Sequence, residues 1–330
     1  MIPIVIPYPV GGEVVEEKDV NFYDYDGTLV AGYTVAEAQA LTALPDAPDH
    51  SEDDVPLTFQ EWNHALSQIN AATGKTFIGA TYIPTDGKTH FIIRVTAVTG
   101  GSVPFYFTKS NATDTLSIDY GDGHTASNSA NASVTFTPTT ALSVGDHHVT
   151  VWLSSGEGTY SLGQGTNTTC VVGGGASSYQ YTVLKCYVGE NVPSISDYAF
   201  TSRYSLSTLS LPVGITGIGS SSINTVCALT FIVFPKSLSS LGSSAFSYCY
   251  SLKNILFSNG LTNIPSSAFS NCLGLLFYDF SACQEVPTLA STNAFTSINK
   301  VGIMMVPSAL YSGWSTATNW STYANYMVGV

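Results

Sequence analysis

The sequence predicts a multidomain, mainly β protein with three parts in order along the chain. Residues 1–98 are expected to form a small α+β domain, residues 99–172 a β-sandwich, and residues 179–330 a solenoid of stacked coils with a short helical cap. Three observations carry this prediction. Charged residues are only 10%, short alternating stretches lie between Gly and Asp turns, and apolar residues recur every 23 positions near the C-terminus.

Composition excludes several classes of protein. The 330 residues are 44% hydrophobic, which is enough for well-filled cores, and 10 Lys and Arg against 23 Asp and Glu give a net charge of −13. So few basic residues exclude a nucleic-acid partner. No apolar run reaches the roughly 20 residues of a membrane span. The apolar N-terminus has no basic start, so we also expect no classical export signal.

The first part combines strands with two expected helices. A strand is predicted near residues 20–25, and Thr34-Val-Ala-Glu37 is a capping box that predicts a short helix ending before Pro45. Thr58-Phe-Gln-Glu61 predicts a second helix, supported by apolar residues at helical spacing: Phe59, Trp62, Leu66 and Ile69. Two further strands, near 77–83 and 89–98, flank an Asp86-Gly87 turn and predict a hairpin.

The stretch Asp24-Tyr25-Asp26-Gly27-Thr28 resembles the first motif of haloacid-dehalogenase phosphatases. That resemblance would make Asp24 the nucleophile and Asp26 the acid/base. The family also needs a later Ser or Thr, a Lys and a metal-binding Asp pair on a doubly wound sheet, and Asp53-Asp54 come too early for that pair. We therefore expect a turn between two strands, no enzyme and no cofactor, with a phosphatase as a remote alternative.

The second part reads as all-β. Asp119-Tyr-Gly-Asp-Gly123, followed by the stretch at 145–151, resembles the PKD-like, Ig-like β-sandwich, which implies a spacer or a carbohydrate-associated unit. His147 and His148 are adjacent in an expected strand and should face opposite sides, so we predict no metal site there. Residues 173–178 have the composition of a flexible linker.

The six cysteines contain no CxxC pair, which argues against zinc. Four of them lie in the repeats and are expected to be buried thiols. A Cys170–Cys186 disulfide is possible.

The repeats are the strongest pattern in the chain. An apolar column recurs at intervals of 23, 23, 23 and 26 residues, at Phe200, Ile223, Phe246, Phe269 and Phe295. Further apolar columns keep the same register, for example Leu206, Leu229, Leu252 and Leu275. One coil cannot bury its apolar face alone, so the coils should stack and pair short strands in parallel.

This frame, with its Ala-Phe, Cys, Leu and Ile columns, resembles the BspA-like class of bacterial leucine-rich repeats. The tail from about residue 306, which carries Trp314 and Trp320, is similar to the closing unit of such arrays. The overall order of parts resembles modular proteins of gut bacteria and their phages.

Side chains between the core columns of the repeat strands should face outward, because strand side chains alternate. Several of them are apolar and would form an exposed patch, which usually marks an interface. The expected outward residues are Thr208, Ser210, Phe231, Val233, Asn254, Leu256, Phe277 and Asp279.

Surface-adhesin modules without an export signal fit a phage virion protein, a tail- or head-attached component. This is the function expected from the sequence; a bacterial cell-surface adhesin is the alternative. The expected partners are other virion proteins or a host surface glycan or protein, together with further copies of the chain.

Overall fold

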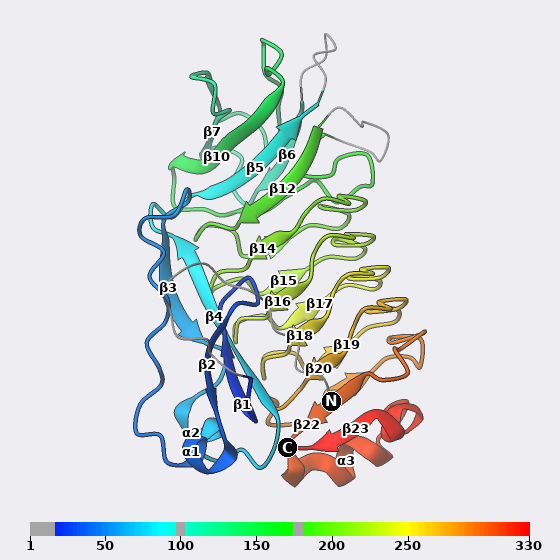
Figure 1. Cartoon of the computed structure of the whole chain (residues 1–330). Helices are drawn as coiled ribbons and strands as arrows, with labels where there is room; N and C mark the ends of the chain where they lie inside the picture. The colour runs from blue at the N-terminus through cyan, green and yellow to red at the C-terminus, as the bar shows by residue number, and fades with distance from the viewer. Residues whose placement is uncertain (1–16, 97–102, 174–180) are drawn as a thin grey trace.

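The computed structural model describes residues 17–96, 103–173 and 181–330. Figure 1 shows an elongated molecule with β-sheets at one end, a stack of coils in the middle and short helices at the other end. The N-terminal strands lie along one side of the stack. Strands dominate and helices are few and short, so the predicted mainly β class is confirmed.

The N-terminal part is a four-stranded sheet in the order β2-β1-β4-β3. β1 and β4 are parallel, and the other neighbours are antiparallel. The capping box that begins the first helix is confirmed: Thr34 Oγ1 accepts from the Glu37 amide at 3.3 Å, and Glu37 Oε2 accepts from the Thr34 amide at 2.7 Å. The elements are β1 (Val20–Tyr23), β2 (Leu29–Tyr33), α1 (Val35–Gln39), β3 (Leu57–Trp62), α2 (Leu66–Ile69) and β4 (Thr76–Pro84).

The helix predicted from Thr58 is wrong. Its first half is the strand β3, which pairs antiparallel with β4 and is bulged between Phe59 and Glu61. Aromatic and β-branched residues suit a half-buried strand, and pairing with β4 outweighs the helical spacing of the apolar side chains. Only α2 is helical. It begins after Ala65, whose amide donates to Gln68 Oε1 at 2.8 Å.

The predicted hairpin at Asp86-Gly87 is also wrong, although the turn itself is present. The Gly87 amide donates to the Pro84 carbonyl at 2.8 Å. β4 lies between β1 and β3, so both of its edges are occupied and the next strand must leave the sheet. That strand, β5 (Thr89–Val95), instead belongs to a six-stranded sheet at the end of the molecule and does not pair with β4.

Two six-stranded sheets form that end, and both continue into the repeats. The strands are β6 (Phe105–Lys109), β7 (Thr115–Asp119), β8 (Thr125–Asn128), β9 (Ser133–Phe136), β10 (Gly145–Ser155), β11 (Tyr160–Leu162) and β12 (Tyr181–Tyr187). β5 pairs with β10 and β12, although the sequence suggested a boundary after residue 98. The PKD-like assignment of this region stays a prediction. Of the predicted linker, residues 174–178 lie outside the described residues.

The repeats supply two series of short parallel strands. One series comprises β14 (Thr208–Ser210), β16 (Phe231–Val233), β18 (Asn254–Leu256), β20 (Phe277–Asp279) and β22 (Ile303–Val306). The other comprises β13 (Ser194–Ile195), β15 (Gly217–Ile218), β17 (Ser240–Leu241), β19 (Asn263–Ile264) and β21 (Thr288–Leu289). Partners lie 23 residues apart, as in Phe231, Asn254 and Phe277, and then 26 apart at Ile303.

One core runs through the end sheets and the coils. β12 pairs in parallel with β14, and β11 with β13, so the end sheets cover the first coil. Phe91 of β5 and Phe246 of the coils belong to the same buried cluster. The rings of Phe246 and Phe269 stack at 5.4 Å, and those of Phe269 and Phe295 at 5.6 Å. Stacking of coils therefore buries what a single coil would expose.

Short helices close the other end of the stack. They are η1 (Ser308–Leu310), α3 (Tyr311–Thr316) and η2 (Trp320–Tyr326), and the chain ends in β23 (Met327–Gly329), parallel to β22. Trp314 and Trp320 are fully buried, and their rings contact Phe280 at 4.8 and 5.5 Å. The Trp320 indole donates to the Pro287 carbonyl at 2.6 Å, whereas the buried Trp314 indole nitrogen has no hydrogen-bond partner among the described residues. Aromatic side chains thus cover the last coil.

All six cysteines are free thiols, and Cys170 and Cys186 are not bonded to each other. Cys249 and Cys272 are buried in the coils and donate to the carbonyls of Ile223 and Phe246 at 3.0 and 2.9 Å. None of the helices in the described ranges combines the length and apolar character that crossing a bilayer requires.

Candidate binding surface

The Asp24 stretch is a turn, as predicted. The Asp24 amide donates to the Thr28 carbonyl at 2.8 Å, and the Gly27 amide to the Asp24 carbonyl at 3.0 Å. Gly27 has φ +92°, a left-handed conformation that favours glycine. β1 and β2 flank this turn and pair antiparallel. A motif that would present a nucleophile at a strand end is here a hairpin turn.

The Asp24 carboxylate is buried and already engaged. Oδ1 accepts from the Tyr25 amide at 2.8 Å, and Oδ2 lies 2.7 Å from His50 Nε2. His50 Nδ1 lies 2.8 Å from Asp53 Oδ2, so this histidine joins the acidic loop to the turn. Burial alone would lower the pKa of His50, but its two carboxylate partners, Asp24 and then Asp53, raise it overall. Burial raises the pKa of Asp24. These contacts fasten the acidic loop to the turn and engage both oxygens of the Asp24 carboxylate.

An open pocket of about 310 Å³ lies beside this loop. It is lined by Tyr25, Glu52, Asp53, Asp54, Val55, Lys185 and Tyr187. Across residues 17–96, 103–173 and 181–330, no three His, Cys, Asp or Glu side chains are arranged to hold a metal ion. His147 and His148 face opposite sides as predicted: His147 Nε2 lies 2.8 Å from the Ser143 carbonyl, and His148 Nε2 lies 2.7 Å from His90 Nδ1.

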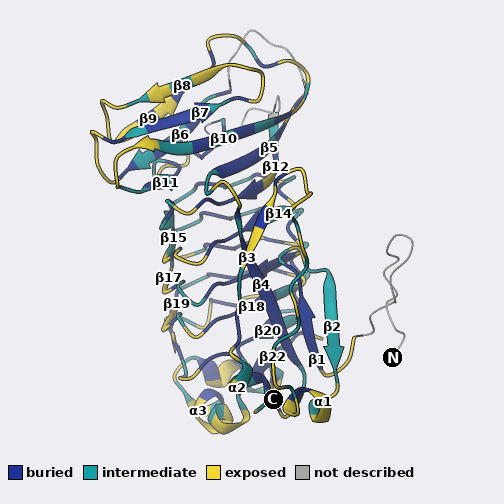
Figure 2. Ribbon diagram, turned by 90° about the vertical axis from the view of Figure 1, so that its left-hand side faces the viewer, coloured by how far each residue is buried: buried dark blue, intermediate teal, exposed yellow. Residues whose placement is uncertain are grey.

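The eight outward residues predicted as a binding face are largely covered. Phe231, Val233 and Leu256 point away from the coil core, but β1 and β4 pack over them. Figure 2 shows β4 and β18 buried where the N-terminal sheet lies against the stack. Gly79 of β4 comes so close that a Cβ there would lie 2.5 Å from Val233 Cγ2. The strand alternation was therefore right, and the expectation of a free apolar patch was wrong.

The remaining members of that face also meet the N-terminal sheet or its edge. The rings of Phe277 and Phe77 are edge to face at 4.8 Å. Asp279 is fully buried, and its Oδ2 accepts from the Phe77 amide at 2.7 Å. Ser210 Oγ donates to the Tyr82 carbonyl at 3.4 Å. Thr208 and Asn254 are partly exposed at the margin. The other six residues form a joint between two parts of the chain.

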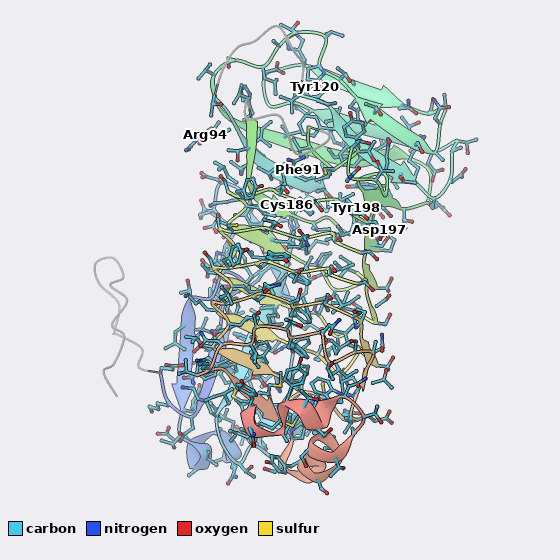
Figure 3. All side chains as sticks on the ribbon, turned by 90° about the vertical axis from the view of Figure 1, so that its right-hand side faces the viewer. Phe91, Arg94, Tyr120, Cys186, Asp197 and Tyr198 are labelled. Carbon is cyan, nitrogen blue, oxygen red and sulfur yellow. The ribbon has the colours of Figure 1, made fainter. Side chains whose placement is uncertain are left out.

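A different side of the coils stays uncovered, and we call it the turn edge. It consists of the segments that lead from the two-residue strands to the next three- or four-residue strand: 196–207, 219–230, 242–253, 265–276 and 290–302. Figure 3 faces this side, with Asp197 and Tyr198 near its first coil. The N-terminal strands lie to one side of this view.

The backbone of the turn edge is a regular ladder. Amides donate to carbonyls of the next coil, as from Tyr198 to Ser220 at 3.0 Å, from Thr225 to Ser247 at 2.8 Å and from Tyr248 to Ser270 at 2.9 Å. Non-glycine residues with positive φ recur in the same register, at Tyr198, Ser221, Ser244 and Ser267, and at Ser202, Thr225, Tyr248 and Asn271. Such residues are uncommon, and their repetition gives every coil the same shape.

The turn edge exposes a line of large side chains, which we call the exposed row: Tyr204, Tyr248, Tyr250 and Leu273. Their exposed fractions are 52%, 42%, 44% and 52%. Tyr204, Cys227, Tyr250 and Leu273 follow the 23-residue interval, so they lie above one another in successive coils. This column lies four positions after the buried Phe column, but its residues differ from coil to coil, so it does not stand out in the sequence beside the uniformly apolar columns.

The repeat region matches a known family. Residues 176–301 match the family described as BspA type leucine rich repeat region, in six copies. A leucine rich cell surface protein from Faecalibacterium prausnitzii A2-165 is similar over 39% of this chain and 43% of that chain, with 21% identity and a TM-score of 0.30. The pneumococcal vaccine antigen PcpA is similar over 43% of this chain and 33% of that chain, with 15% identity and a TM-score of 0.34.

The chain thus spans less than half the length of either solved chain. No curated protein matches it in sequence. The family match coincides with the stacked coils and includes the exposed row. Residues 176–301 are therefore a leucine-rich repeat region of the BspA type.

Proposed function

We propose that this protein is a non-enzymatic binding protein of the bacterial cell surface, which meets its partner through the turn edge. The observation that carries the proposal is the exposed row on a hydrogen-bonded, regularly repeated backbone. A rigid surface loses little conformational entropy on binding, and exposed tyrosines combine apolar area with a hydroxyl group.

The other parts fit a supporting role. The end sheets cover the first coil, the aromatic helices cover the last, and the N-terminal sheet covers the strand face of β16, β18 and β20. The turn edge is a side of the stack that these parts leave open. The one motif that resembled an active site is a turn whose carboxylate is engaged by His50. These contacts support binding and give no basis for catalysis.

A surface location is favoured over a virion because the repeat region is of the BspA type and no observation on the molecule favours a particle. Self-association of the chain stays a prediction, which sedimentation of the full chain would test.

Immunogold labelling with antibody against residues 181–330 tests the location. Intact cells and density-purified particles from the source culture should be compared. Gold on the outside of intact cells is the expected result. Gold on particles, with cells unlabelled, would overturn the surface assignment and restore the virion reading.

A further inference from the structure

The positive charges of this acidic protein are distributed unevenly. Five of its ten Lys and Arg residues are ion-paired with carboxylates: Lys18, Lys75, Lys88, Arg94 and Lys236. Lys109 is buried and donates to three backbone carbonyls, and Arg203 is buried. Lys185 lines the pocket that also holds Glu52, Asp53 and Asp54. Most cations are therefore already matched by acidic or carbonyl groups.

The two that remain lie on the turn edge. Lys253 and Lys300 are exposed, and among the ion pairs of the described residues neither has a partner. Lys253 follows Tyr250 by three residues in the same segment, and Lys300 lies in the last segment. Both are thus available to an anion from outside the chain.

Acidic residues are nearly missing from the same surface. The five segments of the turn edge contain a single one, Asp197, whose Oδ1 accepts from the Ser220 amide at 2.6 Å. The chain as a whole carries −13. An anionic partner would be repelled by the other faces and attracted at the turn edge, so the local charge favours a ligand with carboxylate or similar groups.

The uncharged side chains indicate what kind of anion. The turn edge is rich in Ser, Thr and Asn around the exposed row, whereas Ser is depleted in protein–protein interfaces. Hydroxyl and amide groups both donate and accept hydrogen bonds, as sugar hydroxyls do. Tyrosine offers a flat apolar ring with a polar tip, which suits the face of a sugar ring.

The repetition of the surface points the same way. Parallel strands are spaced by about 4.8 Å, so a side-chain column on stacked coils recurs at that small, constant step. Tyr204 and Tyr250 belong to one column and lie two coils apart. A partner built from repeated units can meet such a column at several coils, as a glycan chain would.

We propose that the turn edge binds an acidic glycan, with sugar rings on Tyr204 and Tyr250 and carboxylates paired with Lys253 and Lys300. This deepens the proposed function and rests on it for the biological setting. The binding itself is a property of the purified chain and can be measured without knowing where the protein is located.

The test is binding of the full chain to two acidic polysaccharides, polygalacturonate and hyaluronan, and to their carboxyl-reduced forms. We expect at least one acidic polymer to bind, with affinity that falls as salt rises, and its carboxyl-reduced form to bind about tenfold more weakly. Tyr250→Ala and the double variant Lys253→Gln/Lys300→Gln should each weaken binding about tenfold.

Matched controls lie outside the turn edge. Tyr311→Ala removes another exposed tyrosine, and Lys185→Gln another exposed lysine. Neither should change the affinity. The proposal is overturned if neither acidic polymer binds, if the reduced forms bind equally well, or if the controls weaken binding as much as the turn-edge variants. If no acidic polymer binds but gold labels intact cells, the glycan proposal is rejected and the proposed surface function stands. If a glycan binds but cells carry no gold, only the proposed location is rejected.

Discussion

The carboxylate of Asp279 accepts a hydrogen bond from the backbone amide of Phe77 at 2.7 Å, across the joint between the coils and the N-terminal sheet. The two residues are 202 positions apart. The other oxygen, Oδ1, accepts from the Ser281 amide at 2.8 Å. One buried side chain thus satisfies a strand of one part and a turn of another, which makes the joint specific as well as apolar.

Asp279→Ala should destabilise the protein by about 2–3 kcal/mol, because the buried Phe77 amide and the part-buried Ser281 amide lose their acceptor. Urea unfolding of the full chain measures this loss. Ser210→Ala is the matched control, since its hydrogen bond across the same joint is long at 3.4 Å. Equal losses in the two variants would contradict the role given to Asp279.

The same carboxylate makes stability depend on pH. Burial raises the pKa of Asp279 from 3.8 to about 6, although the bonds from Ser281 and Phe77 lower it in part. The folded chain therefore binds this proton more tightly than the unfolded chain. Its contribution to the free energy of unfolding is fully present below pH 3.8 and is lost as pH rises through about 6.

Asp279→Asn removes the titration and serves as the reference. The free energy of unfolding of the native chain minus that of the variant should fall by about 3 kcal/mol between roughly pH 3.5 and pH 7. Urea titrations at a series of pH values give this difference. A difference that grows with pH would show that the carboxylate is stabilised as an anion.

Close packing of β4 on the coils gives a third prediction. Gly79→Ala would place a Cβ 2.5 Å from Val233 Cγ2 and 2.9 Å from Leu256 Cδ1. Overpacking of this kind costs about 1–3 kcal/mol. Gly217→Ala is the control, because its Cβ would meet only Ser194 Cβ, at 3.8 Å. Thermal unfolding measures the effect in both variants. If Gly79→Ala unfolds at the same temperature as the native chain, β4 does not cover the repeat strands.

The repeats could be predicted from sequence because each coil buries the same columns, so the signal is local and is repeated. The capping box at Thr34 and the turn at Asp24 are local in the same way. The strand β3 could not be found, because its pairing with β4 decides its conformation against helical spacing. The cover over Val233 and Leu256 depends on residues more than 150 positions away, for which strand alternation carries no signal.

The exposed row shows a different limit. Its spacing was present in the sequence, but spacing alone cannot tell an exposed column from a buried one. Burial of the neighbouring Phe column and the left-handed residues between them set which side chains point out. The exposed row can therefore be identified as a candidate site only from the structure, in which the strand face of the repeats is covered.

The link between His50 and its two carboxylates gives the last prediction. His50 contacts Asp24 and Asp53 and lies among the rings of Tyr25 and Tyr82, with Asp26 nearby on the same turn. Its pKa is raised above 6.5 in the folded chain, so the stability it adds is present below pH 6.5 and is lost as pH rises through the raised value. The acidic loop at 46–56 should therefore be held more firmly at about pH 6 than at about pH 8.5.

Limited digestion with proteinase K at the two pH values should cut the native chain in this loop faster at the higher pH. His50→Ala should be cut rapidly at both, whereas His124→Ala, which changes an exposed histidine, should behave like the native chain. Equal cutting of the native chain at both pH values would mean that the charge on His50 does not hold the loop.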